Sequence, residues 1–139
     1  MQVVSRRSSV ALVCWTLAAG ACSVSKREVV VGDYGTENTA AVESLKLKGD
    51  GSFEQRVTLK ADGRRLVAEG TWSFDAGDSE ITFDDKFMMV LDGWGRPVAD
   101  PAVVHDGVVI LPVHRLLGRT RIEYYEGLYY RKIGRRESG

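Results

Sequence analysis

The feature that most constrains the fold of this chain is a period-two alternation of apolar and polar residues, broken by short turn sequences. The alternating stretches are residues 44–48, 53–59, 66–74 and 81–83. This pattern is typical of antiparallel strands with one buried face. The turn sequences at residues 49–51, 61–63 and 75–78 are rich in Asp and Gly and recur every 12 to 14 residues. They predict hairpins between successive strands.

This regular spacing predicts an all-β domain, an antiparallel up-and-down meander of about eight strands that closes into a small barrel. The sequence contains no long amphipathic helix. We expect a first strand at residues 29–34, and a helical turn or loose connection at residues 36–42. Further strands are expected at residues 87–91, 108–111, 119–125 and 128–133. The first two of these are continuous apolar runs, which predicts that both of their faces are covered. Pro112 cannot donate to a ladder and indicates an edge or a bulge.

The first 22 residues have the features of an export signal. Arg6 and Arg7 precede an apolar stretch at residues 10–22, and about 13 residues are too few for a membrane-spanning helix of ~20. Small residues 19–21 run directly into Cys22, which resembles the lipobox of bacterial lipoproteins, although Ala19 stands where that family usually has Leu. The resemblance implies cleavage before Cys22, a lipid on its sulfur with acyl chains such as palmitate, and a folded body anchored in the cell envelope outside the cytoplasm. Ordinary signal peptidase cutting the same bond is the alternative.

The domain organisation follows from that cleavage. We expect a signal peptide at residues 1–21, a lipidated tether at 22–28, a barrel at 29–134 and a polar tail at 135–139. Cys22 would then be the only cysteine, and a lone thiol in an exported protein is a liability that lipidation removes. By analogy with bacterial lipoproteins, Ser23 rather than Asp after the cysteine favours the outer membrane.

Charge is balanced overall but unevenly distributed. Without residues 1–21 the chain has 17 basic and 19 acidic residues, which argues against nucleic-acid binding. Residues 69–106 contain nine acidic and two basic side chains, whereas residues 115–139 contain seven basic and three acidic ones. The two groups either complement one another within one sheet or form a basic edge that faces anionic lipid headgroups or an acidic partner.

Several motifs resemble small bacterial lipocalin-like lipoproteins. The resemblance lies in a strand that ends in Asp-Gly at residues 50–51 with Phe53 opening the next, in Gly-Thr-Trp at residues 70–72, and in a last strand at residues 128–133. It covers residues 44–84 and 128–133. The resemblance implies the barrel fold and a binding role, but it does not specify a ligand.

Motifs for catalysis or metal binding are weak. His105 and His114 lack the further ligands of a metal site. The acidic residues 75–80 lack the ligand spacing of a calcium loop and are expected to form a solvated turn. No nucleophile motif is present. We therefore predict a protein that is not an enzyme and that has no metal or other cofactor.

The long segment at residues 92–107 is the most suggestive one for binding, because long loops are often binding elements. In one interpretation it is a lid, with Trp94 stacking on a ligand and Arg96 meeting an anionic group. In the other, Trp94 plugs the barrel end and Arg96 lies across its ring. Trp72 is expected in the core. The predicted ligand site comprises Trp94, Arg96, Trp72 and His114.

These observations predict a membrane-anchored envelope lipoprotein that binds a small apolar or amphipathic ligand in the barrel mouth. The alternative is a filled barrel without a ligand, which acts on another envelope protein as an interaction or inhibitor module. Packing of the interior separates the two hypotheses, because a ligand needs an empty, apolar mouth.

Overall fold

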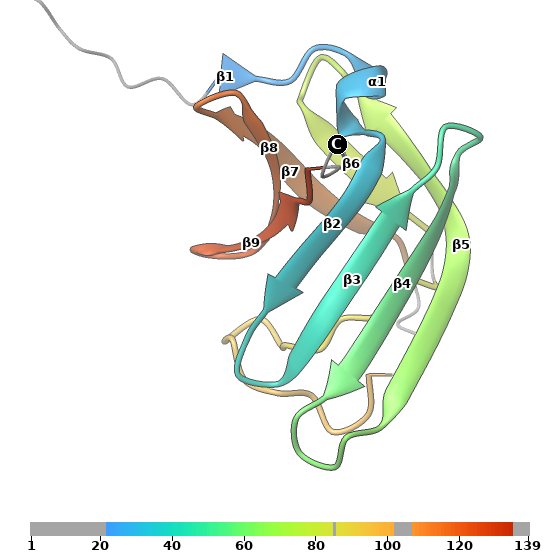
Figure 1. Ribbon diagram of the computed structural model, residues 1–139, viewed down its shortest axis with the longest axis vertical. Coiled ribbons are helices and arrows are strands. Elements are labelled where there is room, and N and C mark those ends of the chain that lie inside the picture. Colours follow the sequence, from blue (N-terminus) through green and yellow to red (C-terminus); the bar gives the residue numbers. More distant parts are fainter. Residues whose placement is uncertain (1–21, 85, 102–106, 135–139) are drawn as a thin grey trace, which may run out of the picture.

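The structure is a computed structural model that describes residues 22–84, 86–101 and 107–134. Eight strands, β2 to β9, form one closed antiparallel barrel, with a short strand β1 and a single helical turn α1 before them (Figure 1). The elements are β1 Cys22–Ser23, α1 Arg27–Val30, β2 Gly32–Glu37, β3 Ala41–Leu47, β4 Ser52–Leu59, β5 Arg65–Asp75, β6 Glu80–Phe83, β7 Val109–Leu116, β8 Arg119–Tyr125 and β9 Leu128–Lys132.

The strand order confirms the predicted meander. Each strand from β2 to β9 pairs with the next one along the chain, and β9 returns to pair with β2. The closing seam is short, since only Tyr34 and Gly35 of β2 are in register with β9. The resulting barrel is consistent with a lipocalin-like fold, and its closure leaves the eight strands without a long open edge.

The predicted alternation sets which side chains face inward. In β3 every second residue is buried, and in β4 Phe53, Gln55, Val57 and Leu59 are buried in the same way. The hairpin between these strands turns at residues 49–51. Gly51 has a φ of 89°, which favours glycine, and Asp50 accepts a hydrogen bond from the Ser52 amide at 2.9 Å.

An aromatic cluster fills part of the barrel core. The Phe83 ring lies 4.2 Å from that of Phe87 and 5.2 Å from that of Phe53, between ring centroids. Tyr124 and Tyr130 form a second edge-on pair at 5.4 Å. Aromatic pairs in this geometry contribute about 0.5–1.5 kcal/mol beyond the area that they bury.

The predicted start of the barrel was wrong in detail. The apolar residues 29–31 lie largely in and just after α1, and the first barrel strand begins at Gly32. The segment 36–42, expected as a helical turn or loose connection, belongs mostly to β2 and β3. A helix of four residues is about one turn long, which is too short for a helical period to be visible in the sequence. Whether such a turn forms depends on its packing against the barrel.

Two further strand predictions need correction. Residues 87–91 form no strand, although four of the five are buried. The run at 108–111 opens β7, but Val108 and Ile110 are exposed, so only one face of that strand is covered. Pro112 lies inside β7 beside β6, at the point where pairing of β7 passes from β6 to β8.

The two barrel ends are closed differently. Residues 86–101 pass across one end, and α1 lies at the other (Figure 1). At the helix end Val30 is fully buried, and its carbonyl accepts a hydrogen bond from the Tyr34 hydroxyl at 2.5 Å. Trp72 is buried nearby; its indole N–H donates to the Lys48 carbonyl and Arg27 lies over its ring at 4.4 Å.

Candidate binding surface

Residues 87–91 lie in the barrel interior, and four of the five are buried. Phe87 packs in the aromatic cluster described above. The Gln55 side chain pairs with the Met88 backbone as a strand would, accepting from its amide at 2.8 Å and donating to its carbonyl at 2.9 Å. The Tyr124 hydroxyl accepts from the Val90 amide at 2.6 Å. Inward-facing side chains therefore bond the backbone of a segment whose pairing with another backbone is limited to its end, where Leu91 forms a single bridge with Pro97 and the Val90 carbonyl accepts from the Val98 amide.

A buried carboxylate lies at the centre of this network. Glu43 is 3% exposed; its Oε1 accepts from the Tyr130 hydroxyl at 2.8 Å and from Gln55 Nε2 at 3.3 Å. Its Oε2 accepts from Asn38 Nδ2 at 3.0 Å. Burial raises the pKa of the Glu43 carboxyl to about 7, although the three hydrogen bonds favour the charged form and lower it.

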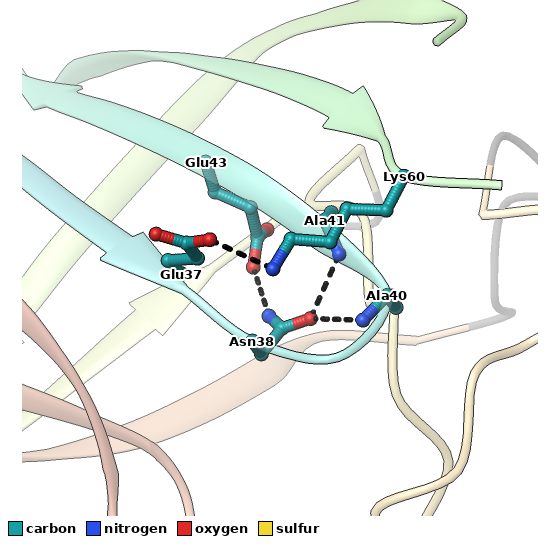
Figure 2. Close-up of polar contacts among 6 residues, drawn as sticks. All are labelled: Glu37, Asn38, Ala40, Ala41, Glu43 and Lys60. Atoms are coloured by element: carbon teal, nitrogen blue, oxygen red, sulfur yellow. Dashed lines mark hydrogen bonds and ion pairs between the residues drawn. The ribbon is translucent and has the colours of Figure 1, made fainter. Parts of the chain in front are cut away.

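Asn38 connects this carboxylate to the β2–β3 turn. Figure 2 shows its amide nitrogen directed at Glu43, while its Oδ1 accepts from the amides of Ala40 and Ala41. The Glu37–Lys60 ion pair, at 2.8 Å, lies on the exposed side of the same turn. Because Glu43 is enclosed by the barrel, we interpret it as a structural group of the interior.

The Trp94 turn, residues 92–96, lies on the outside of the barrel. Asp92 Oδ1 accepts from the amides of Trp94 at 2.8 Å and Arg96 at 2.9 Å, and Asp92 Oδ2 accepts from Arg96 Nε at 3.2 Å. Gly95 has a φ of 72° and lies against the Tyr125 ring, where a β-carbon would come within 2.8 Å of Cε1. The hydrogen bonds to Asp92 and the contact of Gly95 with Tyr125 therefore hold the backbone of the turn in one conformation.

Trp94 itself is 81% exposed, so the interpretation of this residue as a plug of the barrel end is wrong. Arg96 is also placed differently from the prediction, because it pairs with Asp92 and not with the indole. The residues that fill the interior at this end are those at 87–91, which the sequence indicated as a strand. The backbone bonds to Asp92 turn the indole outward, away from the buried residues before it.

The four residues of the predicted ligand site lie in three separate places. Trp72 is in the core beside α1, as expected, whereas Trp94 and Arg96 are on the turn at the other end. His114 lies on the outer face of β7, with Nε2 2.8 Å from Glu123 Oε2 on β8 and its ring edge-on to Tyr129. No single pocket therefore contains all four side chains.

The other sequence candidates carry no assembled chemistry. His105 lies outside the described residues. Asp75 accepts from the amides of Gly77 and Asp78, which makes its segment a self-capped turn, in line with the prediction of a solvated turn. Over the residues that the structure describes, no three His, Cys, Asp or Glu side chains gather in a way that could hold a metal ion.

A shallow groove of about 390 Å³ lies at the base of the Trp94 turn. Its lining is mainly apolar and includes Met89, Leu91, Val98, Val109 and Tyr125. The groove lies on the outside of the barrel and includes Asp92 and Gly93 of the turn. It is thus a surface on which an apolar group could lie beside Trp94.

A second groove, of about 500 Å³, lies at the α1 end between β7, β8 and β9. It is lined by Val29, Arg115, Arg119, Thr120, Lys132 and Ile133, among others. Lys132 Nζ donates to the Val29 carbonyl at 2.7 Å, and the pKa of Lys132 is lowered by burial and, to a lesser extent, by repulsion from Arg115. The groove therefore has three basic side chains beside the apolar side chains of Val29 and Ile133.

Glu43 and Gln55 are absent from the predicted site residues, although the sequence contains a signal for both. Each stands at an inward position of an alternating strand, between apolar residues on the same face. A polar residue at such a position must find partners in the core. The partners themselves, Met88 and Tyr130, are distant in sequence and cannot be read from the pattern.

Comparison of the chain with protein-family models, with curated proteins and with solved structures finds no match. None of the helices in the described part of the chain is long and apolar enough to cross a membrane.

Proposed function

We propose that this chain is a lipid-anchored protein of the bacterial cell envelope that binds a protein partner through the outside of a filled barrel. The observation that carries the proposal is the insertion of residues 87–91 into the barrel, where Gln55 and Tyr124 bond their backbone. A ligand in the barrel would have to displace these buried residues and break those bonds. Binding at the outer surface requires neither change.

The Trp94 turn is the part of that surface best suited to a partner. Exposed tryptophans are enriched among residues that dominate binding energy in protein interfaces. The turn is already ordered by Asp92 and by the contact of Gly95 with Tyr125. Presenting a large ring on a fixed turn lowers the conformational entropy lost on association.

Crosslinking in cells tests this function. We would express the full chain with a photoreactive benzophenone amino acid in place of Trp94, and in a matched strain in place of Val67, which is 61% exposed on β5. We expect one discrete protein adduct from position 94 and none from position 67. Equal adducts from both positions, or none from either, would contradict the proposal.

A small apolar or amphipathic ligand is the second candidate, and the apolar groove beside Trp94 favours it. Its site would use Trp94 and Arg96 on the outside of the barrel, without Trp72 or His114. Native mass spectrometry of the mature protein purified from its envelope separates the two functions. A reproducible added mass that disappears in Trp94→Ala but persists in Val67→Ala would support the ligand; a bare protein would support the partner.

The proposal also includes a membrane anchor. Acyl chains are attached to Cys22, and the outer membrane is the favoured location. Attached chains contribute about 0.8 kcal/mol per buried CH₂, so two or more hold a protein on a membrane. Mass spectrometry of the first peptide of the mature protein is expected to show acylated Cys22 at its start. An unmodified thiol there would contradict lipidation while leaving the function of the Trp94 turn open to its own test.

A further inference from the structure

The β7–β8 turn presents two leucines to solvent at the barrel end where the described chain begins. Leu116 is 42% exposed and Leu117 is 93% exposed. The turn has two central residues, Leu117 and Gly118, because Leu116 and Arg119 are the last pair in register. Figure 1 shows this turn beside β1. Folding alone therefore leaves the Leu117 side chain almost entirely in solvent.

The backbone of this turn disfavours a leucine. Leu117 has a φ of 51° and Gly118 a φ of 75°, and two positive values are the requirement of a type I′ hairpin turn. Asn, Asp and Gly adopt positive φ readily, whereas a branched aliphatic residue there is strained. Because Leu117 is strained and almost fully exposed, it does not stabilise the folded domain. We therefore expect it to contact something outside the domain.

Basic side chains surround the two leucines. Arg115 and Arg119 flank them in sequence, and both line the basic groove with Lys132. Neither arginine forms an ion pair with any residue that the structure describes. Ile133, also exposed, lies at the edge of the same groove. We call these six residues the basic tip: Arg115, Leu116, Leu117, Arg119, Lys132 and Ile133.

The basic tip lies next to the proposed anchor. Cys22 pairs with Arg115 and Ser23 pairs with His114 through the backbone of β1 and β7. Acyl chains on Cys22 would therefore enter the membrane within one strand spacing, about 5 Å, of the basic tip. This geometry brings the tip to the headgroup layer whenever the anchor is in the bilayer.

We propose that the basic tip docks on the anionic phospholipid surface, with Leu116 and Leu117 in the interface and the basic side chains at the headgroup phosphates. Aliphatic side chains bury area at the interface, and each basic residue near an anionic surface adds to the attraction. The proposal rests on the anchor at Cys22 for its orientation. It orients the α1 end toward the membrane and the Trp94 turn toward the compartment beyond.

The other charges at this end set the tilt of the barrel. The β5–β6 turn carries Asp75 and Asp78 on the opposite side of β1, and Ser79 of that turn accepts from the Val24 amide at 2.9 Å. These carboxylates would be repelled by an anionic surface. The barrel therefore contacts the membrane with its β7–β9 side and not squarely on its end.

An environment-sensitive label tests the docking. The full chain would be expressed as Leu117→Cys, purified from bacterial membranes, labelled with NBD and reconstituted in vesicles of phosphatidylcholine with or without phosphatidylglycerol. Val67→Cys, on the outer face of β5, is the matched control. We expect NBD emission at position 117 to shift to shorter wavelength with phosphatidylglycerol and to return at high salt. The label at position 67 should not change.

Two further variants keep the test decisive. Arg115→Glu with Arg119→Glu, added to Leu117→Cys, should abolish the shift while circular dichroism stays that of the parent. Leu117→Asn suits a positive φ and should raise the melting temperature. A lower melting temperature for Leu117→Asn would contradict the argument that folding alone disfavours this leucine.

The outcomes separate docking from anchoring. If the mature amino-terminal peptide is acylated but the label stays in water with both vesicle compositions, the docking is overturned and the anchor stands. If Cys22 is unmodified, it takes up a second NBD, which mass spectrometry counts. A shift at position 117 relative to the control would then support docking without the anchor. Capture of an acidic protein by the tip, without a shift on vesicles, would overturn the membrane as its partner.

Discussion

Single residues at inward positions of this barrel do more than fill space. Glu43 and Gln55 replace apolar side chains in two neighbouring strands, and together they hold Met88 and Tyr130. A fully bonded buried network specifies one arrangement of the core, since any slip leaves a polar atom without a partner. Among the described residues, no buried side-chain nitrogen or oxygen lacks a hydrogen-bond partner.

Glu43 makes stability depend on pH. Its carboxyl has a pKa of about 7 in the folded barrel and about 4.5 when unfolded, so the folded state binds the proton more tightly. The resulting stabilisation is fully present below pH 4.5 and is lost as pH rises through 7. We expect the free energy of unfolding to fall by about 3 kcal/mol across that window.

Chemical denaturation at several pH values from 5 to 8 measures this effect. The same series on Glu43→Gln should lack most of the slope, because glutamine does not titrate. Parallel slopes in the two proteins would show that other groups set the pH dependence.

Gly70 shows why a residue of the Gly-Thr-Trp motif suits this fold. Asp84, just after β6, accepts from the Thr71 amide at 2.7 Å, and a β-carbon on residue 70 would overlap its carboxylate. Gly70→Ala should therefore displace Asp84 and cost about 1.5–3 kcal/mol, the range for a hydrogen bond to a charged group. In a double-mutant cycle, Gly70→Ala should cost little once Asp84→Ala is present. Additive costs would mean that the alanine acts through another contact.

At the scale of elements, the alternating strands and the Asp-Gly turns were predictable, because a half-buried strand needs every second residue apolar. The segment at residues 87–91 was not. A short continuous apolar run fits a buried strand as well as any other buried segment, and Phe87 and Val90 look the same in both. The partners that decide between them, Gln55 and Tyr124, are remote in sequence.

The candidate sites, like the strands, were predictable only where the local sequence decides the structure. The Trp94 turn could be located from its glycines and its length, but its outward direction depends on bonds to Asp92. The pairing of His114 with Glu123 depends on the β7–β8 register, which a single sequence does not reveal. Trp72 was placed correctly in the core because it falls on the apolar phase of its strand.

The inserted segment should be a main source of stability. Phe87→Ala removes a ring that is packed against Phe53 and Phe83, and such changes typically cost 3–5 kcal/mol. Trp94→Ala, a few residues further on but exposed, should stay within about 0.5 kcal/mol of the parent. Denaturant unfolding of both variants checks this contrast. Similar costs would mean that the segment does not pack as described.

At the scale of the whole molecule, the barrel is uneven around its circumference. The β3–β4 pair has seven residues of each strand in register, whereas the β9–β2 seam has two. The seam should open more often than the rest of the barrel, because only a short register of backbone hydrogen bonds joins β9 to β2. Hydrogen–deuterium exchange is expected to be faster in β9 than in β3 and β4. Uniform protection at the level of global unfolding would contradict this.

The attachment of β1 to β7 also has a mechanical consequence. A pull on Cys22 would first peel β1 from Arg115 and His114, then free Val24 from Ser79 and unwind α1, all before β2 bears any load. Drawn out, residues 22–31 would reach about 35 Å. The segment is thus a folded tether that can extend. Under tension the barrel can move away from its point of attachment by that length and still remain closed.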